Sequence, residues 1–271
     1  KLRGLGLCYY IGSILGYKDE SAKVIFQDDG MVDILVGTQS NGQGHETVFA
    51  QFLSDQTGIP ADHIRVVQGD SDLIARGGGT GGSRSGTVQA NATLQTVAVM
   101  QKAFRAFLSD KLDVDADQIV FDDERFRAPG SNLSPTFLEV ADMARAAGRE
   151  DLMQHSAYAV LDSRSFPNGA HICEVEIDPD TGAVEVARYS VVDDFGNLLN
   201  PMLVEGQVHG GVAQGIGQAI SEHVVYDDQG QLLSASFMDY AVPRAKDVPF
   251  YQFETEPLPT TTNVMGMKGS G

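Results

Sequence analysis

The sequence has no tryptophan and only two cysteines, and the cysteines lie far apart at Cys8 and Cys173. Both have apolar, strand-like neighbours, so we expect core thiols and neither a disulfide framework nor a paired thiolate metal site. So few cysteines fit a reducing compartment, and we expect a cytoplasmic protein. No apolar stretch approaches the roughly eighteen residues that a membrane-spanning helix needs, and the first residues show no secretory signal pattern. The sequence is therefore typical of a soluble globule.

Positive charge is also scarce. The chain carries 19 Lys and Arg against 37 Asp and Glu, which gives a formal net charge of -18. Lys and Arg form no run or stripe, so a phosphate backbone and an anionic membrane surface are both poor partners. With 42% hydrophobic residues in 271, the chain can bury a substantial core as one large domain or two lobes.

Several common functional motifs are absent. No phosphate-binding G-x-x-x-x-G-K-[ST] loop occurs, and Gly215-Ile216-Gly217 continues without the third glycine of a dinucleotide fingerprint. No G-x-S-x-G nucleophile elbow is present. The six histidines form no H-E-x-x-H, and no C-x-x-C exists. Ordinary NAD, ATP, hydrolase and protein-ligated metal sites are therefore disfavoured, and we assign no metal ligand.

Apolar periodicity predicts alternating elements in the first part of the chain. The expected strands cover residues 4–11, 22–27, 31–36 and 64–68, and the expected helices cover 46–57, 83–108 and 135–147. Asp28-Asp29-Gly30 is a turn sequence that should join two of these strands into a hairpin. Residues 69–82 form a long glycine-rich loop, and the acidic stretch 110–124 should be a surface connection.

The second part predicts a similar mixture. Strands are expected at 155–161, 170–177, 183–193 and 223–226, with a helix that starts at Asn200-Pro201 and carries 206–220. The rest should be turns and irregular chain. The predicted class is α+β, with mixed sheets and packed helices. The domain would have two lobes, residues 1–150 and 151–271.

Three glycine-rich segments stand out, at 37–47, 77–85 and 206–217. Each lies at a turn or a helix beginning, where glycine lets the backbone approach a ligand and free N–H groups favour anions. A single glycine cluster is usually only a tight turn. The coincidence of three favours a large phosphorylated ligand.

These segments, in this order, resemble the molybdopterin-binding large subunits of the xanthine oxidase family of molybdenum hydroxylases, above all the aerobic carbon monoxide dehydrogenase-like large chains. The resemblance spans nearly the whole chain. Its blocks are G-T-x-x-x-G-Q-G-H-E-T at 37–47, G-D-S-D at 69–72, T-G-G-S-R-S at 80–85, F-P-N-G at 166–169, E-V-E-I-D-P-D-T-G at 174–182, V-D-D-F-G at 192–196, G-Q-V-H-G-G-V-A-Q-G-I-G-Q at 206–218 and A-S-F-M-D-Y-A-V-P at 235–243.

The resemblance implies the C-terminal, second cofactor-binding domain of such a subunit. Its cofactor would be molybdenum on molybdopterin cytosine dinucleotide, with the metal bound by the cofactor and not by protein. We do not expect this fragment to hold the cofactor when it stands alone. Partner subunits would carry [2Fe-2S] clusters (an iron–sulfur small subunit) and FAD (a medium subunit). The N-terminal half of the same large subunit would be a further partner.

The family's pattern also implies which residues bind the cofactor. They would be Gly42, Gln43, Gly44, His45, Thr80, Gly82, Ser83, Arg84, Ser85, Gln214, Lys268, Gly269 and Gly271. Without the resemblance, Arg84 could equally be part of a surface ion pair, Gln43 a turn residue and Gln214 a polar helix spacer. His45 and His209 lie inside the glycine-rich segments, although a lone histidine is more often a structural hydrogen-bonder.

In that family a catalytic glutamate directly follows G-x-K-G-x-G, which here is Gly266 to Gly271. The expected glutamate would follow Gly271, so we expect no catalytic residue in this chain and no turnover by this fragment alone. The substrate, whether carbon monoxide, an aldehyde or a heterocycle, cannot be read from these residues. The alternative is a non-catalytic, family-like module for binding or assembly.

Overall fold

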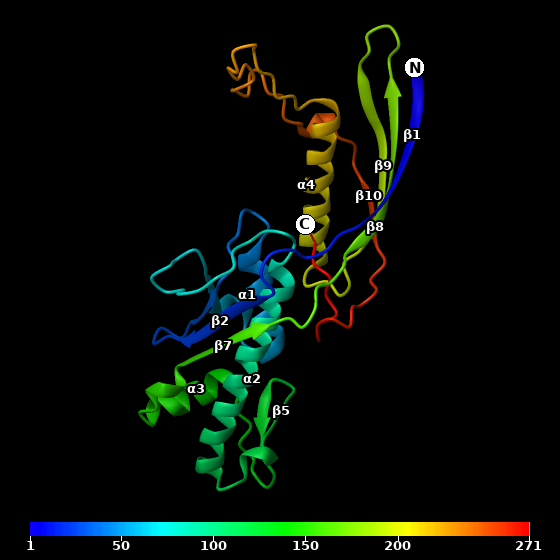
Figure 1. Cartoon of the computed structure of the whole chain (residues 1–271). Coiled ribbons are helices and arrows are strands. Elements are labelled where there is room, and N and C mark those ends of the chain that lie inside the picture. Colours follow the sequence, from blue (N-terminus) through cyan, green and yellow to red (C-terminus); the bar gives the residue numbers. More distant parts are fainter. Residues whose placement is uncertain (271) are drawn as a thin grey trace. The chain divides into compact units, whose positions relative to one another are not determined.

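The computed structural model describes residues 1–270 and divides into two compact units (Figure 1). The first unit contains Lys1–Ser13 and Phe166–Pro259, and the second contains Ile14–Ser165 and Thr260–Gly269. Both units are discontinuous in sequence. The division expected at residue 150 falls inside the second unit, because the strand that begins at Gln154 pairs with a strand from the start of that unit.

The second unit is built on a four-stranded mixed sheet of order β4-β3-β2-β7. Its strands are β2 (Asp19–Phe26), β3 (Val32–Val36), β4 (Ile64–Val67) and β7 (Gln154–Val160). Strands β2 and β3 form the predicted antiparallel hairpin, and β4 pairs parallel to β3. Along β2 buried positions alternate with half-buried ones, as the two-residue period of a strand requires. Ala22, Val24 and Phe26 therefore face the core.

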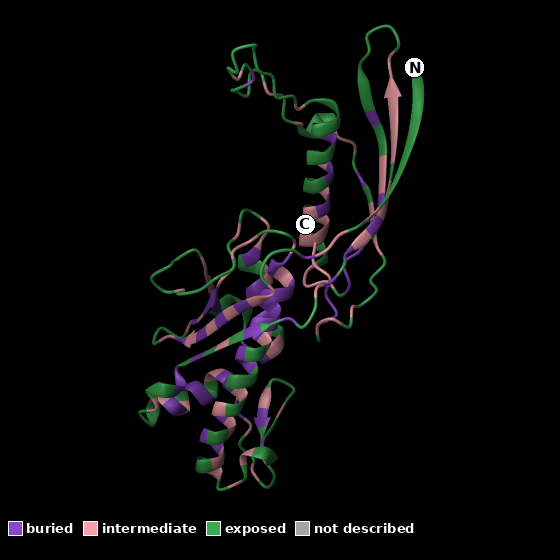
Figure 2. Cartoon of the chain, in the orientation of Figure 1, coloured by how far each residue is buried: buried purple, intermediate pink, exposed green. Residues whose placement is uncertain are grey.

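Three helices pack with this sheet: α1 (His45–Thr57), α2 (Ser85–Leu112) and α3 (Phe137–Ala146). The long α2 contacts β2 and β7, while α1 contacts β4 and α2. The buried residues gather where α2 meets the sheet (Figure 2). Phe104 on α2 lies within 5.6 Å, centroid to centroid, of Phe26 and Phe137, which joins the three elements in one aromatic core. The predicted helices at 46–57, 83–108 and 135–147 are confirmed.

The acidic stretch expected to be only a surface connection contains a small hairpin of β5 (Val120–Asp122) and β6 (Arg125–Arg127). Phe121 and Phe126 pack on Phe137, so aromatic burial stabilises a pair of strands too short to be evident from periodicity. Short 3-10 turns complete the chain at η1 (Ala61–His63), η2 (Ala116–Gln118), η3 (Glu150–Leu152) and η4 (Ala245–Asp247).

The first unit is a second mixed sheet with one long helix. The sheet has the order β1-β8-β9-β10, with β1 (Leu2–Ile11), β8 (Asn168–Ile177), β9 (Val184–Asp194) and β10 (Gln252–Thr255). Helix α4 (Pro201–Ile220) has Pro201 at its first position and an Asn200 cap that accepts from the Leu203 N–H at 3.1 Å. Val208, Val212 and Ile216 bury one face of α4 against β9.

Three expectations about this unit are wrong. Cys8 is exposed and not in the core, because β1 is the edge strand of its sheet, and Cys173 is only half-buried. Residues 223–226 form no strand and contribute only an isolated bridge from Tyr226 to Leu232. The chain expected to be irregular near the end includes β10, which pairs in parallel with β9. No helix in residues 1–270 is long and apolar enough to cross a membrane.

Candidate functional site

In the second unit, the chain that leaves β3 packs directly on the glycine-rich loop before α2. The Gly79 N–H donates to the Gly37 carbonyl at 3.1 Å, and the Gln39 N–H donates to Thr80 Oγ1 at 3.0 Å. A Cβ on Gly77 would lie 2.4 Å from the Gly37 oxygen, so the two backbones meet where only glycine fits. Two segments that are far apart in sequence thus form one surface.

The start of α1 presents groups that the protein leaves unused. Gly44 is the N-cap at φ 76°, and it offers no side chain to the free N–H groups of the first turn. His45, the first helical residue, is buried, and its Nδ1 has no hydrogen-bond partner. The hydroxyl of Thr38 is also buried and without a partner. Burial lowers the pKa of His45, which favours the neutral ring.

The start of α2 is similar. Ser85 is the first residue of α2, and its hydroxyl donates to Thr80 Oγ1 at 3.0 Å. The N-cap residue Arg84 makes no side-chain hydrogen bond to the helix start. Gly82 and Ser83 precede it with φ of 60° and 58°. A positive φ is unusual for serine and marks a backbone held in place by its surroundings. The Gly82 carbonyl accepts from the Leu15 N–H at 2.8 Å, which is one such restraint.

The segment before the end of the chain completes this surface. Gly269 has φ 88°, and a Cβ there would lie 2.3 Å from the Ser83 carbonyl oxygen. The Lys268 carbonyl accepts from the Ser165 hydroxyl at 2.9 Å. Gly269 therefore packs against the loop before α2, while Lys268 is tied to Ser165. The predicted contact at Gly271 lies outside the described residues.

Arg84 lies beneath this surface. Its Nε donates to the Tyr17 carbonyl at 2.8 Å and Nη1 to the Gly79 carbonyl at 2.6 Å. Its Nη2 donates to the Asp19 carbonyl at 2.7 Å and pairs with Glu20 Oε2 at 3.1 Å. The residue is 2% exposed, so the alternative of a surface ion pair is wrong. All three guanidinium nitrogens bind protein atoms.

Sequence reasoning missed Glu20, although a signal was present. It occupies the same phase of β2 as the buried Ala22, Val24 and Phe26, a register in which a carboxylate is unexpected. A charge at a core-facing strand position predicts a buried partner, and here that partner is Arg84. Gln68, whose Oε1 accepts from the Ser40 N–H at 2.9 Å, was also missed, because nothing in its neighbourhood marks it.

The two predicted glutamines differ. Gln43 binds its own loop, with Oε1 accepting from the Asn41 N–H. Gln214 is exposed on α4 and belongs to the first unit, whereas the other described site residues, from Gly42 to Gly269, belong to the second.

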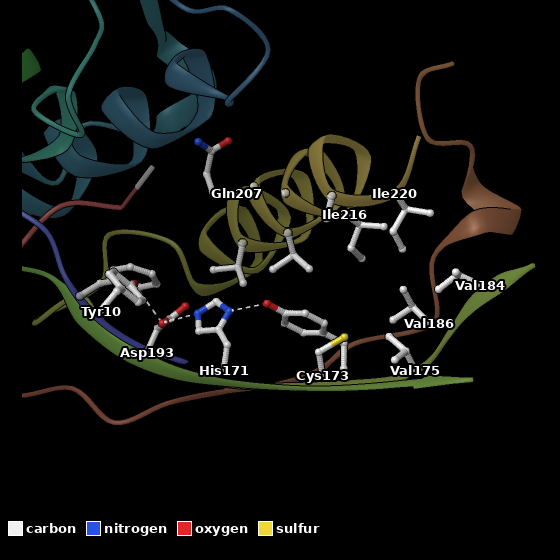
Figure 3. A pocket seen from close by; sticks show the side chains of 17 residues that line it. Tyr10, His171, Cys173, Val175, Val184, Val186, Asp193, Gln207, Ile216 and Ile220 are labelled. Atoms are coloured by element: carbon white, nitrogen blue, oxygen red, sulfur yellow. Dashed lines mark hydrogen bonds and ion pairs between the residues drawn. The ribbon is translucent and has the colours of Figure 1, made fainter. Parts of the chain in front are cut away.

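The first unit contains a cavity of about 580 Å³ between its sheet and α4 (Figure 3). One end is apolar and includes Val175, Val184 and Ile220. Gly211 and Gly215 also line it, and a Cβ at either would meet nothing within 4 Å. The helix side of the cavity is thus left open by glycine.

The other end of the cavity holds a chain of polar side chains. Tyr10 donates to Asp193 Oδ1 at 3.0 Å, His171 Nε2 lies 3.2 Å from the same oxygen, and His171 Nδ1 lies 2.9 Å from the Tyr189 hydroxyl (Figure 3). Tyr189 can donate to Nδ1 while Nε2 donates to Asp193, so each of these hydrogen-bond donors has an acceptor within the group of four side chains. Because a carboxylate lies at its centre, this end of the cavity does not suit a phosphate.

These tyrosines give a pH dependence that can be measured. Burial raises the pKa of Tyr189 to about 12, above the ordinary value of 10 in the unfolded chain. The folded state therefore retains a proton that the unfolded state loses, so stability should fall as pH rises from 10 to 12. Urea midpoints across this range should show a shallower fall in Tyr189→Phe than in the wild type. An unchanged slope in the variant would contradict the assignment.

Within residues 1–270, no group of three His, Cys, Asp or Glu residues is placed to hold a metal ion. The family model of the molybdopterin cofactor-binding domain matches residues 1–249. The chain belongs to this family. Most of the second unit and most of the first lie within the matched residues of this molybdopterin cofactor-binding domain.

The relatives agree with this assignment. The carbon monoxide dehydrogenase large chain of Afipia carboxidovorans is 34% identical over 258 residues, which cover 93% of this chain and 32% of the relative. The solved structure of carbon monoxide dehydrogenase from Oligotropha carboxidovorans matches with a TM-score of 0.89 at 32% identity. The match covers 99% of this chain and 35% of the matched chain. Quinoline 2-oxidoreductase from Pseudomonas putida gives a TM-score of 0.88 at 30% identity, covering 98% of this chain and 36% of its own. The chain thus spans about a third of these relatives.

The residues of the second unit fit the cofactor of this family. The buried Thr38 hydroxyl and His45 Nδ1 have no protein partner, and two helices begin without a side-chain cap. A pterin and a pyrophosphate present many acceptors, and N–H groups at helix starts are suitable donors for them. At Gly42 and Gly81 a Cβ would meet nothing within 4 Å, so the surface there is open to a ligand.

Proposed function

We propose that this chain is the cofactor-binding part of the large subunit of a molybdenum hydroxylase. One observation carries the proposal: the second unit brings residues 37–39, 77–85 and 268–269 together beside two uncapped helix starts. The family assignment supplies the identity of the ligand that this arrangement suits. We propose the cytosine dinucleotide form, because the relatives named above are bacterial.

The proposed roles follow from position. The N–H groups at the start of α1, after Gly44, and at the start of α2, after Arg84, would hold phosphate or pterin oxygens. Ser83 and Ser85 would add polar contacts from the loop before α2. When bound, the cofactor supplies a redox-active molybdenum held by the dithiolene of the pterin. This chain's own residues bind and orient it, and no general base is assigned among them.

The proposal also covers the substrate and the partner subunits of the enzyme. Carbon monoxide, a heterocycle and an aldehyde are all candidates. The relatives include a carbon monoxide dehydrogenase large chain, the nicotine 6-hydroxylase large subunit of Paenarthrobacter nicotinovorans and an aldehyde oxidoreductase molybdenum-binding subunit of Escherichia coli. A complete enzyme would add an iron–sulfur subunit, an FAD subunit and the remaining part of the large subunit. The relatives' greater length supports this last point.

The direct test is chemical analysis of this chain produced together with the remaining part of its large subunit and the partner subunits, in a bacterium that makes molybdopterin cytosine dinucleotide. We expect molybdenum and pterin to copurify in equal amounts, and mild acid to release CMP. GMP in place of CMP would refute the cytosine form. Absence of both metal and pterin would refute the proposal and favour the non-catalytic module.

A substitution at Thr80 tests the assembled loops. Its hydroxyl links the Gln39 N–H to Ser85, and valine keeps the shape but removes both hydrogen bonds. We expect Thr80→Val to lower pterin content about threefold to tenfold, because a lost pair of hydrogen bonds is worth about 1 kcal/mol or more. Pterin fluorescence after acid oxidation measures it, with Thr181→Val in the first unit as a control. Equal pterin in Thr80→Val and wild type would refute the role.

A further inference from the structure

We infer that Glu20 and Arg84 are positioning residues, a buried ion pair that fixes the glycine-rich loop on which the proposed cofactor would rest. The inference extends the proposed function, and its structural part holds without any cofactor. It also assigns Arg84 a role different from the phosphate donor that the family resemblance implies.

The pair contacts both sides of the loop junction. Glu20 Oε2 accepts from the Gly78 N–H at 3.0 Å and from Arg84 Nη2 at 3.1 Å. Arg84 Nη1 donates to the Gly79 carbonyl at 2.6 Å. Because the carboxylate binds the N–H of Gly78 and the guanidinium binds the C=O of Gly79, this pair of glycines is held at both ends. The peptide between them is thereby oriented so that its own N–H, that of Gly79, donates to the Gly37 carbonyl.

The glycines around the pair give independent support. A Cβ at Gly37 would lie 2.0 Å from Glu20 Oε1, and a Cβ at Gly78 would lie 2.5 Å from Arg84 Nη2. Neither residue has a positive φ, so backbone conformation does not require glycine at either position. What requires glycine is the close approach of the backbone to the two charged groups. The sequence therefore has its glycines where the ion pair needs space.

The same geometry argues against direct phosphate binding by Arg84. Its side chain is 2% exposed, and its three nitrogens already bind three carbonyls and a carboxylate. The Glu20 charge beside it cancels most of the field that would attract an anion. Arg84 therefore affects the ligand-facing surface indirectly, by holding the loop that forms it.

The first test needs no cofactor and uses trypsin. Arg76, directly before Gly77, is exposed, and its carbonyl accepts from the Ser21 hydroxyl at 3.0 Å. Gly78→Ala keeps both charges but displaces Arg84, so we expect cleavage after Arg76 to accelerate about tenfold as local opening becomes easier. Gly81→Ala is the matched control, because its Cβ would meet nothing within 4 Å. Equal cleavage rates in Gly78→Ala and Gly81→Ala would overturn the inference.

The second test separates positioning from ligand binding. Glu20→Gln leaves the Arg84 charge intact, so a phosphate-binding Arg84 would retain the cofactor as well or better. A positioning pair predicts instead that Glu20→Gln and Arg84→Lys each lower pterin content by a similar factor, and that combining them adds little more. Loss in Arg84→Lys with full retention in Glu20→Gln would overturn the inference.

The two tests also separate this inference from the proposed function. If the wild-type chain holds no pterin, the proposed function fails, while the trypsin result still decides whether the pair fixes the loop. A folded state is checked in every variant by far-ultraviolet circular dichroism. The Gly78→Ala comparison does not depend on unpairing a buried charge, so it remains informative if the Glu20 or Arg84 variants do not fold.

Discussion

Gly37→Ala is expected to destabilise the second unit by about 3 kcal/mol, the upper range for forcing extra atoms into a packed interior. A Cβ at this position would lie 2.0 Å from Glu20 Oε1 and 2.7 Å from the Gly77 Cα. Neither neighbour can move freely, because Glu20 is held by Arg84 and the Gly78 N–H, and Gly77 is backbone. Urea unfolding of the full chain, followed by circular dichroism, measures the change.

Gly81→Ala is the control for Gly37→Ala. A Cβ at Gly81 would meet nothing within 4 Å, and its φ is not positive, so we expect a change of less than about 0.5 kcal/mol. A similarly small change in Gly37→Ala would mean that the strand end and the loop are not packed as described.

Gly269→Ala is expected to reduce bound pterin at least about tenfold, a loss that corresponds to about 1.4 kcal/mol of binding free energy. Alanine would suffer the strain of φ 88°, and its Cβ would lie 2.3 Å from the Ser83 carbonyl oxygen. Relief of that contact must move the loop that leads into α2. Pterin fluorescence and molybdenum content, each per mole of chain, measure the result.

A matched control separates strain from displacement. Gly130 has φ 72° in a turn, and a Cβ added there would meet nothing within 4 Å, so Gly130→Ala has the conformational cost alone. We expect normal pterin content in Gly130→Ala. Full pterin content in Gly269→Ala as well would show that the Gly269 contact does not shape the site.

Much of the fold is predictable because apolar residues recur in this sequence at the spacing of strands and helices. The hairpin of β2 and β3 follows from alternation on either side of Asp28-Asp29-Gly30, and α1, α2 and α3 follow from helical spacing. Short elements were not predicted in this way. Strand β10 has four residues and is stabilised by pairing with β9, and that partner is remote in sequence.

Cys8 shows why burial is harder to predict than secondary structure. Its neighbours Leu7 and Tyr9 suggest a core strand, and the strand does form as β1. It forms at the edge of the sheet, however, and Leu7 and Tyr9 are 72% and 70% exposed. Apolar composition predicts a strand, whereas burial depends on what covers it.

The sequence indicated which loops would pack together, but not how Arg84 is used within them. Glycine-rich segments identified the loops, and the structure brings residues 37–39, 77–85 and 268–269 together. The sequence predicts Arg84 to be a ligand-binding residue because it stands between Ser83 and Ser85. Its actual direction depends on Glu20 on another element, and the alternation along β2 marks Glu20 as core-facing without showing which residue it pairs with. Pairing across elements is the information that a single sequence lacks.

The most direct test of the central claim is amide hydrogen exchange of the full chain, compared with and without bound molybdopterin cofactor. We predict that cofactor slows exchange at the two helix starts, residues 44–47 and 84–88, and in the loop at 79–83. The outer strand β1 and the hairpin of β5 and β6 should exchange equally in both samples. Protection confined to other segments, with both helix starts unchanged, would contradict the account.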